Sequence, residues 1–120
     1  MARILVVDDE PNVREVLIQR LRHRNFEVEG AANGEEALAR LQVAPFDVVV
    51  LDLLMPVSAG TDVLRALGQT ERPRVIVLSG LAELWQRHHL EAAPFAVLQK
   101  PVAMAKLLAA IDAAATLRPA

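Results

Sequence analysis

The chain has 120 residues, of which 53% are hydrophobic, so it holds enough apolar side chains for the core of one domain. Its formal net charge is −2 and it has no cysteine, which excludes disulfides, cysteine nucleophiles and thiolate metal sites and gives no sign of a nucleic-acid-binding surface. The apolar run near the N-terminus is too short for a signal peptide or a membrane span, so we expect a cytoplasmic protein with no membrane contact.

Short apolar runs alternate with longer segments of helical period in the first part of the chain. Residues 4–7 form the first run, and residues 11–24 follow with apolar side chains every three or four positions. Residues 26–31 form a weaker run with alternating acidic residues, which indicates a strand at the edge of a sheet. Residues 33–36, Asn-Gly-Glu-Glu, predict the start of a second helix with a capping box.

The same alternation continues to the end of the chain. We expect strands at 48–51, 74–78 and 95–98, and helices near 61–68, 81–90 and 104–111. The run at 48–51 is the most continuously apolar, which predicts a central strand covered on both faces. Strands alternating with helices favour a flavodoxin-like (βα)5 fold, a doubly wound parallel sheet with strand order 2-1-3-4-5. We expect one domain over residues 1–120.

Polar residues follow four of the predicted strands. They are Asp8 and Asp9 after the first, Asp52 after the third, Ser79 and Gly80 after the fourth, and Lys100 after the fifth. In a parallel sheet of this order, ligands bind beyond the carboxyl ends of the strands, where the strand order reverses. Carboxylates gathered there repel each other unless a cation lies between them, and an oxygen-only set suits Mg²⁺. Asp52 could then attack phosphorus and form an acyl phosphate.

Four motifs in this order, VVDDEPNVREVL, DLLMPVSAG, VLSG and LQKP, resemble the receiver domain of bacterial two-component response regulators. The resemblance covers essentially the whole chain. Each motif alone is common, but four of them in order, each at the end of a predicted strand, make a specific signal.

The resemblance implies a role for each of these residues. Asp52 would be the phosphoacceptor, taking a phosphoryl group from a phosphohistidine of a sensor histidine kinase or phosphotransfer protein. The implied Mg²⁺ ligands are Asp8, Asp9, Asp52 and the backbone carbonyl of Leu54. Mn²⁺ could replace Mg²⁺ at this site. The implied phosphoryl-binding residues are Ser79, Gly80 and Lys100, and Lys100-Pro101 would be a cis peptide.

The resemblance also implies how the protein works. It would be a signalling phosphoprotein rather than an enzyme, although it would assist its own phosphorylation and dephosphorylation. Phosphorylation would switch its contacts with a downstream protein or an output domain, and we expect no output domain within residues 1–120. Trp85 could lie on that output surface, or it could simply anchor a helix.

One residue departs from the family pattern. Receivers usually have an aromatic residue three positions before the lysine, and their switch couples it to the hydroxyl residue after the fourth strand. Here Ser79 is present, but Val97 stands at the aromatic position. An alternative function is therefore an interaction module with the receiver fold that does not respond to phosphorylation.

Two further alternatives concern the acidic residues. Asp8 and Asp9 could merely cap the helix that follows them, because acidic side chains are favourable at a helix N-terminus. Asp52 could be the nucleophile of a phosphohydrolase of the haloacid dehalogenase type. That chemistry requires a second carboxylate two residues later, where this chain has Leu54.

Overall fold

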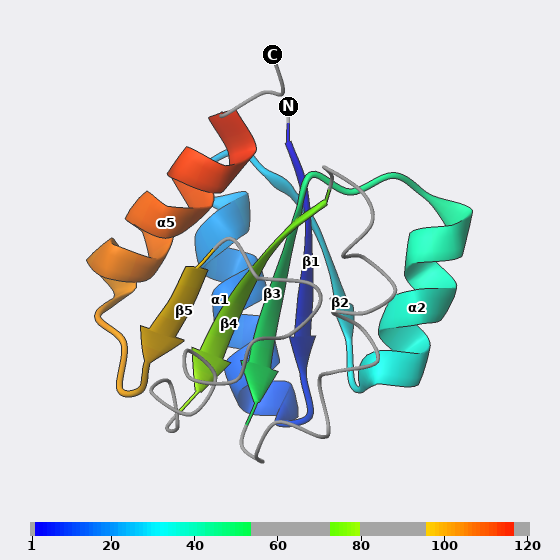
Figure 1. Cartoon of the computed structure of the whole chain (residues 1–120), viewed down its shortest axis with the longest axis horizontal. Coiled ribbons are helices and arrows are strands. Elements are labelled where there is room, and N and C mark those ends of the chain that lie inside the picture. Colours follow the sequence, from blue (N-terminus) through cyan, green and yellow to red (C-terminus); the bar gives the residue numbers. More distant parts are fainter. Residues whose placement is uncertain (1, 54–72, 80–95, 117–120) are drawn as a thin grey trace.

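The computed structural model describes residues 2–53, 73–79 and 96–116 (Figure 1). In chain order the elements are β1 (Arg3–Asp8), α1 (Pro11–Arg22), β2 (Glu27–Ala31), α2 (Gly34–Val43), β3 (Val48–Leu53), β4 (Arg74–Ser79), β5 (Ala96–Gln99) and α5 (Met104–Thr116). Each of these elements was predicted from the sequence, with ends that differ by a few residues. The helices predicted near 61–68 and 81–90 lie outside the described residues.

The described strands form one parallel sheet in the order β2-β1-β3-β4-β5. This confirms the predicted flavodoxin-like topology, with β3 at the centre and β2 at an edge. The side chains of Val48, Val49 and Val50 are completely buried, as a continuously apolar central strand requires.

Helices cover the two faces of the sheet (Figure 1). Successive side chains of a strand point to opposite faces. Accordingly, Ile4 and Val6 of β1 pack in one cluster with α1 and α5, whereas Leu5 and Val7 pack in the other with α2. The sheet therefore forms the middle layer of a three-layer domain, and the carboxyl ends of its strands lie together at one edge.

The ends of the first two helices follow from local side-chain chemistry. Asn33 caps α2 by accepting a hydrogen bond from the Glu36 N–H at 2.8 Å, as predicted. The Glu36 carboxylate accepts from the N–H of Ala32, one residue before the cap, so the reciprocal bond of the capping box is displaced by one position. Helix α1 ends at Arg22, two residues earlier than predicted, and Asn25 takes a left-handed conformation (φ 67°) in the turn toward β2.

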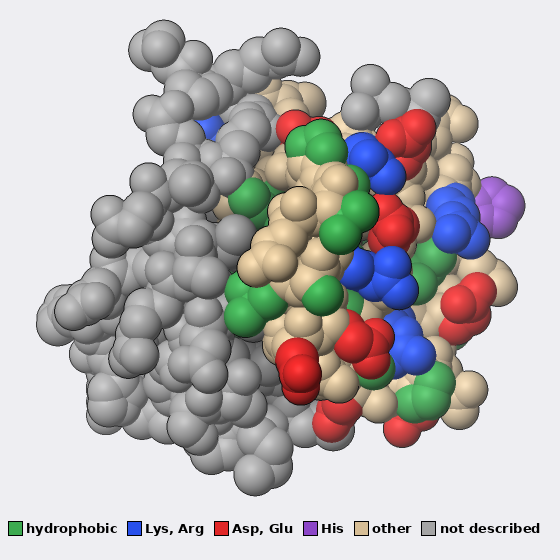
Figure 2. Space-filling model, turned by 90° about the vertical axis from the view of Figure 1, so that its right-hand side faces the viewer, with side chains coloured by type: hydrophobic (Ala, Val, Ile, Leu, Met, Phe, Trp, Pro, Cys, Tyr) green, Lys and Arg blue, Asp and Glu red, His purple; other side chains and the backbone are tan. Residues whose placement is uncertain are grey.

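Charged side chains surround the edge strand β2. Arg3 forms ion pairs with Glu27 and Glu29, and Arg40 forms another with Glu29. Figure 2, which shows this side of the molecule, has acidic and basic side chains alternating across it. Exposed ion pairs add little stability, but charges beside an edge strand hinder its pairing with another chain. In the described part of the chain no helix is long and apolar enough to cross a membrane.

Candidate functional site

The topology brings the predicted site residues to one edge of the sheet. In the β1–β3 ladder the Cα atom of Asp8 is directly opposite that of Asp52. In the β4–β5 ladder Ser79 is opposite Gln99, the residue before Lys100. The backbone of all four strands thus delivers Asp8, Asp52, Ser79 and Lys100 to the carboxyl edge, as expected from the strand order.

Asp8 is the only charged side chain that is fully buried among the described residues, with 2% of its surface exposed. Its Oδ1 accepts a hydrogen bond from the backbone N–H of Glu10 at 2.9 Å. Burial of a carboxylate is costly unless other groups compensate its charge. A buried acid at a strand end is therefore unlike a solvated turn residue, whereas the neighbouring Asp9 is exposed.

The first turn of α1 is capped by Glu10 and not by either aspartate. The Glu10 carboxylate accepts a hydrogen bond from the N–H of Asn12 at 3.2 Å, and Pro11 occupies the first helical position. Neither aspartate is therefore the N-cap residue of α1, although Asp8 Oδ1 accepts the backbone N–H of the cap residue Glu10. Sequence reasoning did not assign this cap, although a proline at the first helical position marks the preceding residue as the N-cap.

Arg14 is a second residue of the site that sequence reasoning missed. Its Nη1 donates a hydrogen bond to the backbone carbonyl of Asp8 at 2.7 Å. No local pattern indicates this contact, because it depends on how α1 packs back against the strands.

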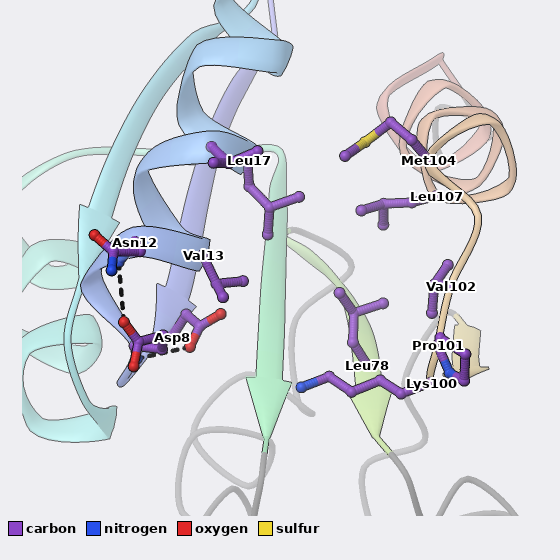
Figure 3. Close-up of a pocket in the computed structure, with 12 residues that line it drawn as sticks. Asp8, Asn12, Val13, Leu17, Leu78, Lys100, Pro101, Val102, Met104 and Leu107 are labelled. Atoms are coloured by element: carbon purple, nitrogen blue, oxygen red, sulfur yellow. Dashed lines mark hydrogen bonds between the residues drawn. The ribbon is translucent and has the colours of Figure 1, made fainter.

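Lys100 approaches from the other side of the site. It directly follows β5, its side chain is half-buried, and the Lys100-Pro101 peptide bond is cis. Figure 3 shows its side chain extending across the sheet edge toward Asp8. The two residues lie at the same end of one open cavity of about 850 Å³. A carboxylate and an ammonium group therefore converge beside the end of β3.

The cavity lies between α1 and α5 and has apolar walls (Figure 3). These walls include Val13, Val16 and Leu17 from α1 and Met104 and Leu107 from α5. An ion pair between Arg24 and Asp112 joins the chain after α1 to α5. The charged site thus opens directly onto an apolar groove between two helices.

Several predicted residues are placed only in part. The side chains of Asp52 and Ser79 lie outside what the structure describes, as do Leu54, Gly80 and Trp85. Val97 is half-buried in the cluster beneath α2, with its Cα opposite that of Val77.

Carboxylate oxygens are the hard ligands that Mg²⁺ prefers, so Asp8 and Asp9 fit this metal. Within the described ranges, however, no group of three acidic or histidine side chains is gathered closely enough to hold a metal ion. The predicted metal site also includes Asp52, whose side chain lies outside the described residues.

Comparison with known proteins agrees with this geometry. The family model of the response regulator receiver domain matches residues 4–112. The transcriptional regulatory protein ResD of Bacillus subtilis is 37% identical over 81 residues, covering 68% of this chain and 34% of ResD. A protein-glutamate methylesterase/protein-glutamine glutaminase of the same organism is 38% identical over 106 residues, covering 84% of this chain and 30% of that protein. The chain thus spans about a third of the length of these curated relatives.

A solved structure extends the similarity to the fold of almost the entire chain. The response regulator TrrA of Thermotoga maritima, in complex with Mg²⁺-BeF, superposes with a TM-score of 0.78 at 32% identity, covering 95% of this chain and 99% of TrrA. The fold and the sequence agree with each other. The sheet has five parallel strands in the order 2-1-3-4-5, with a buried aspartate at the end of β1 and a lysine after β5, and the family match covers residues 4–112. The chain belongs to the receiver domain family of the response regulators of two-component signalling.

Proposed function

We propose that this chain accepts a phosphoryl group on Asp52 from a phosphohistidine of a sensor histidine kinase or phosphotransfer protein. One observation carries the proposal: the Cα atom of Asp52 is opposite that of the buried Asp8 at the carboxyl edge of the sheet. Lys100 extends toward the same edge from β5. These positions support a nucleophile placed between the acidic residues after β1 and the ammonium group of Lys100.

The transfer is a single displacement at phosphorus. A carboxylate oxygen of Asp52 forms a bond to the phosphorus atom, and the bond between phosphorus and the histidine nitrogen breaks. The electron pair of that bond returns to the imidazole nitrogen, which takes up a proton from solvent. The product is an acyl phosphate on Asp52 and a neutral histidine on the donor.

Asp8 and Asp9 would hold Mg²⁺ together with Asp52 and the backbone carbonyl of Leu54, and Mn²⁺ could replace it. When bound, the metal supplies positive charge against the phosphoryl oxygens. TrrA, whose fold this chain shares, was solved with Mg²⁺-BeF, which supports this assignment. Lys100, the Ser79 hydroxyl and the Gly80 N–H would bind the remaining phosphoryl oxygens.

The donor protein would rest on the apolar groove beside the site. A histidine that reaches Asp52 must bring its own protein surface against the residues around the cavity. Val13 and Val16 of α1 line that cavity and are among the few large apolar side chains that the described surface exposes. A partner with apolar side chains around its phosphohistidine would cover them.

We further propose that residues 1–120 act as one receiver domain in the cytoplasm, without direct contact with nucleic acid or membrane. The domain would signal by changing its contacts with a downstream protein or output domain, and Trp85 would lie on that surface. It would not be an enzyme with substrate turnover, although it would assist its own phosphorylation and dephosphorylation.

A second candidate function is an interaction module that keeps the fold and the pocket but does not respond to phosphorylation. Val97 favours it, because this half-buried aliphatic side chain occupies the position of the usual switch aromatic and has no ring to reorient toward Ser79. The two candidates differ in whether helix and strand positions beyond the site change when a phosphoryl group is present.

The primary test is incubation with acetyl phosphate and Mg²⁺ followed by intact mass measurement. We expect the wild-type chain to gain the mass of one phosphoryl group. The Asp52→Asn variant, which keeps the size of the side chain but lacks the nucleophile, should gain none. Absence of the gain in a folded wild-type protein that binds Mg²⁺ would overturn the proposal.

A further inference from the structure

Arg14 holds both ends of the acidic loop formed by residues 8–10. Its backbone N–H donates to the carbonyl of Glu10 at 3.0 Å, which begins the hydrogen bonding of α1. Its side-chain Nη1 donates to the carbonyl of Asp8 at 2.7 Å. A hydrogen bond from a charged guanidinium is stronger than one between neutral groups. One residue thus ties the start of the helix to the end of β1.

The position of this bond along β1 is informative. The β1–β2 ladder has its last pair at Val7 and Ala31, one residue before Asp8. Arg14 therefore holds the backbone of β1 at the first residue beyond the support of its edge neighbour. The residue that it holds there is the buried aspartate of the candidate site.

The path of the Arg14 side chain passes over Gly30 of β2. A Cβ atom at Gly30 would lie 3.1 Å from Cδ of Arg14 and 2.9 Å from Cδ1 of Ile18. Gly30 does not have a positive φ, so the backbone conformation does not require glycine. Glycine within a strand weakens it, and it is often found where another group approaches closely. Here the missing side chain leaves room for two side chains of α1, those of Ile18 and Arg14.

We propose that Arg14 and Gly30 form a positioning pair for the metal-binding loop. Among the described residues the Arg14 side chain donates to the carbonyl of Asp8, so it acts by holding the backbone there. It thereby sets where the Asp8 and Asp9 carboxylates stand relative to Asp52. This inference rests on the proposed function, because it takes these two aspartates as metal ligands.

An arginine suits this role for two physical reasons. Its planar guanidinium carries several N–H donors in a fixed arrangement, so it can hold a backbone carbonyl in a defined direction. Its positive charge also stands beside a loop with three consecutive acidic side chains, Asp8, Asp9 and Glu10. It thus reduces their mutual repulsion before a metal ion binds.

Arg22 provides a matched control on the same helix. Its Nη2 donates to the carbonyl of Val28 at 3.1 Å, so it also joins α1 to the sheet through an arginine–carbonyl bond. It lies in the last turn of α1, at the opposite end from the site. The variants Arg14→Ala and Arg22→Ala therefore remove similar bonds at different distances from the acidic loop.

The test titrates each full-length variant with Mg²⁺ alone and follows backbone amide shifts by NMR. Loss of a residue that orients metal ligands typically weakens metal binding by about tenfold or more, so Arg14→Ala should raise the Mg²⁺ dissociation constant by about tenfold. Arg22→Ala should leave that constant unchanged. Without metal, amide hydrogen exchange at Glu10 should become faster in Arg14→Ala only. The Glu10 N–H donates to Asp8 Oδ1, and this bond depends on Arg14 holding the acidic loop in place. Urea unfolding should show similar losses of stability for both variants.

Gly30→Ala supplies a second, independent arm. In the wild-type background the added methyl group should displace the Arg14 side chain and weaken Mg²⁺ binding. In the Arg14→Ala background the same change should leave Mg²⁺ binding unaltered, because there is no longer a side chain to displace. This lack of additivity identifies the pair, since a clash with Ile18 alone would act equally in both backgrounds.

The outcomes separate this inference from the proposed function. Equal Mg²⁺ affinities for Arg14→Ala and wild type, or equal effects of Arg14→Ala and Arg22→Ala, would overturn the positioning role while leaving phosphorylation of Asp52 untouched. A wild-type chain that binds Mg²⁺ but takes no phosphoryl group would overturn the proposed function alone. A wild-type chain that binds no Mg²⁺ would overturn both.

Discussion

The Cα atoms of Asp8 and Asp52 lie opposite each other in the ladder between β1 and β3. One of these residues ends the first strand, and the other lies near the end of the central strand. They are far apart in the chain, yet the register of the parallel sheet makes them neighbours.

Replacement of Asp8 by asparagine should abolish the response of stability to Mg²⁺. Asparagine keeps an oxygen that can accept the hydrogen bond from the Glu10 N–H, but it removes the buried charge. At a Mg²⁺ concentration of about 100 times the dissociation constant, the wild-type chain should gain about 2.7 kcal/mol in its free energy of unfolding. Urea unfolding with and without Mg²⁺ measures this gain, and the variant should show none.

The control for this experiment is Asp112→Asn, which removes the partly exposed acid of α5 that forms an ion pair with Arg24. It should keep the full stabilisation by Mg²⁺. A variant at Asp8 that responds to Mg²⁺ like the wild type would contradict the metal assignment.

Replacement of Val16 by glutamate should slow phosphorylation by a protein donor and leave phosphorylation by a small molecule unchanged. Val16 is 52% exposed and lines the apolar groove, so a charge there would be buried against the donor protein. A loss of about tenfold in the transfer rate, equivalent to about 1.4 kcal/mol, is expected for an important contact residue. Acetyl phosphate needs no docking surface, so its rate of reaction reports the intact site.

Val43→Glu is the matched control. Val43 is 86% exposed at the end of α2, on the other face of the sheet. It should react with a phosphorylated histidine kinase as fast as the wild type does. Equal rates for the Val16 and Val43 variants would show that the donor does not rest on the groove.

Trp85 should report whether the domain switches. It is the single tryptophan of the chain, so its fluorescence has one source. We expect beryllofluoride with Mg²⁺ to change this fluorescence in the wild type and not in Asp52→Asn. If mass spectrometry or NMR shows that the mimic binds while the fluorescence and the NMR signals of β5 stay unchanged, the second candidate function is correct. Val97 would then mark a receiver that does not transmit phosphorylation.

Truncation of Ile76 to alanine should strongly destabilise the fold. Ile76 is completely buried in β4 and packs in the cluster that joins α1 and α5 to the sheet. Loss of its side chain should cost about 2–5 kcal/mol in the free energy of unfolding, because a cavity remains in the core. Val43→Ala, at an exposed position, should change stability by less than about 0.5 kcal/mol. Thermal or urea unfolding distinguishes the two directly.

The elements that were predicted correctly are those whose signal is local. The unbroken apolar run at Val48–Leu51 requires burial on both faces, and this requirement alone predicts a central strand. The alternating acids Glu27 and Glu29 indicate an edge strand, because acidic side chains along a strand need contact with water. The position of Asp8 at a strand end could likewise be predicted, because it directly follows the apolar run at residues 4–7.

Two contacts at the site could not be predicted in this way. The bond from Arg14 to the Asp8 carbonyl joins a helix side chain to a strand backbone, and nothing in residues 8–14 distinguishes this arginine from a solvated one. The close approach of side chains to Gly30 is equally hidden, because those side chains come from a different element, α1. The groove between α1 and α5 also arises only when both helices pack on the same face.

The sequence by itself thus determined the alternation of strands and helices, the strand order and the residues that gather at the carboxyl edge. Hydrophobic periodicity and strand-end chemistry are properties of neighbouring residues, so they can be read along the chain. Only the tertiary structure decided how deeply Asp8 is buried and how Arg14 holds the acidic loop. Those features depend on distances between elements, and such distances exist only once the helices have packed on the sheet.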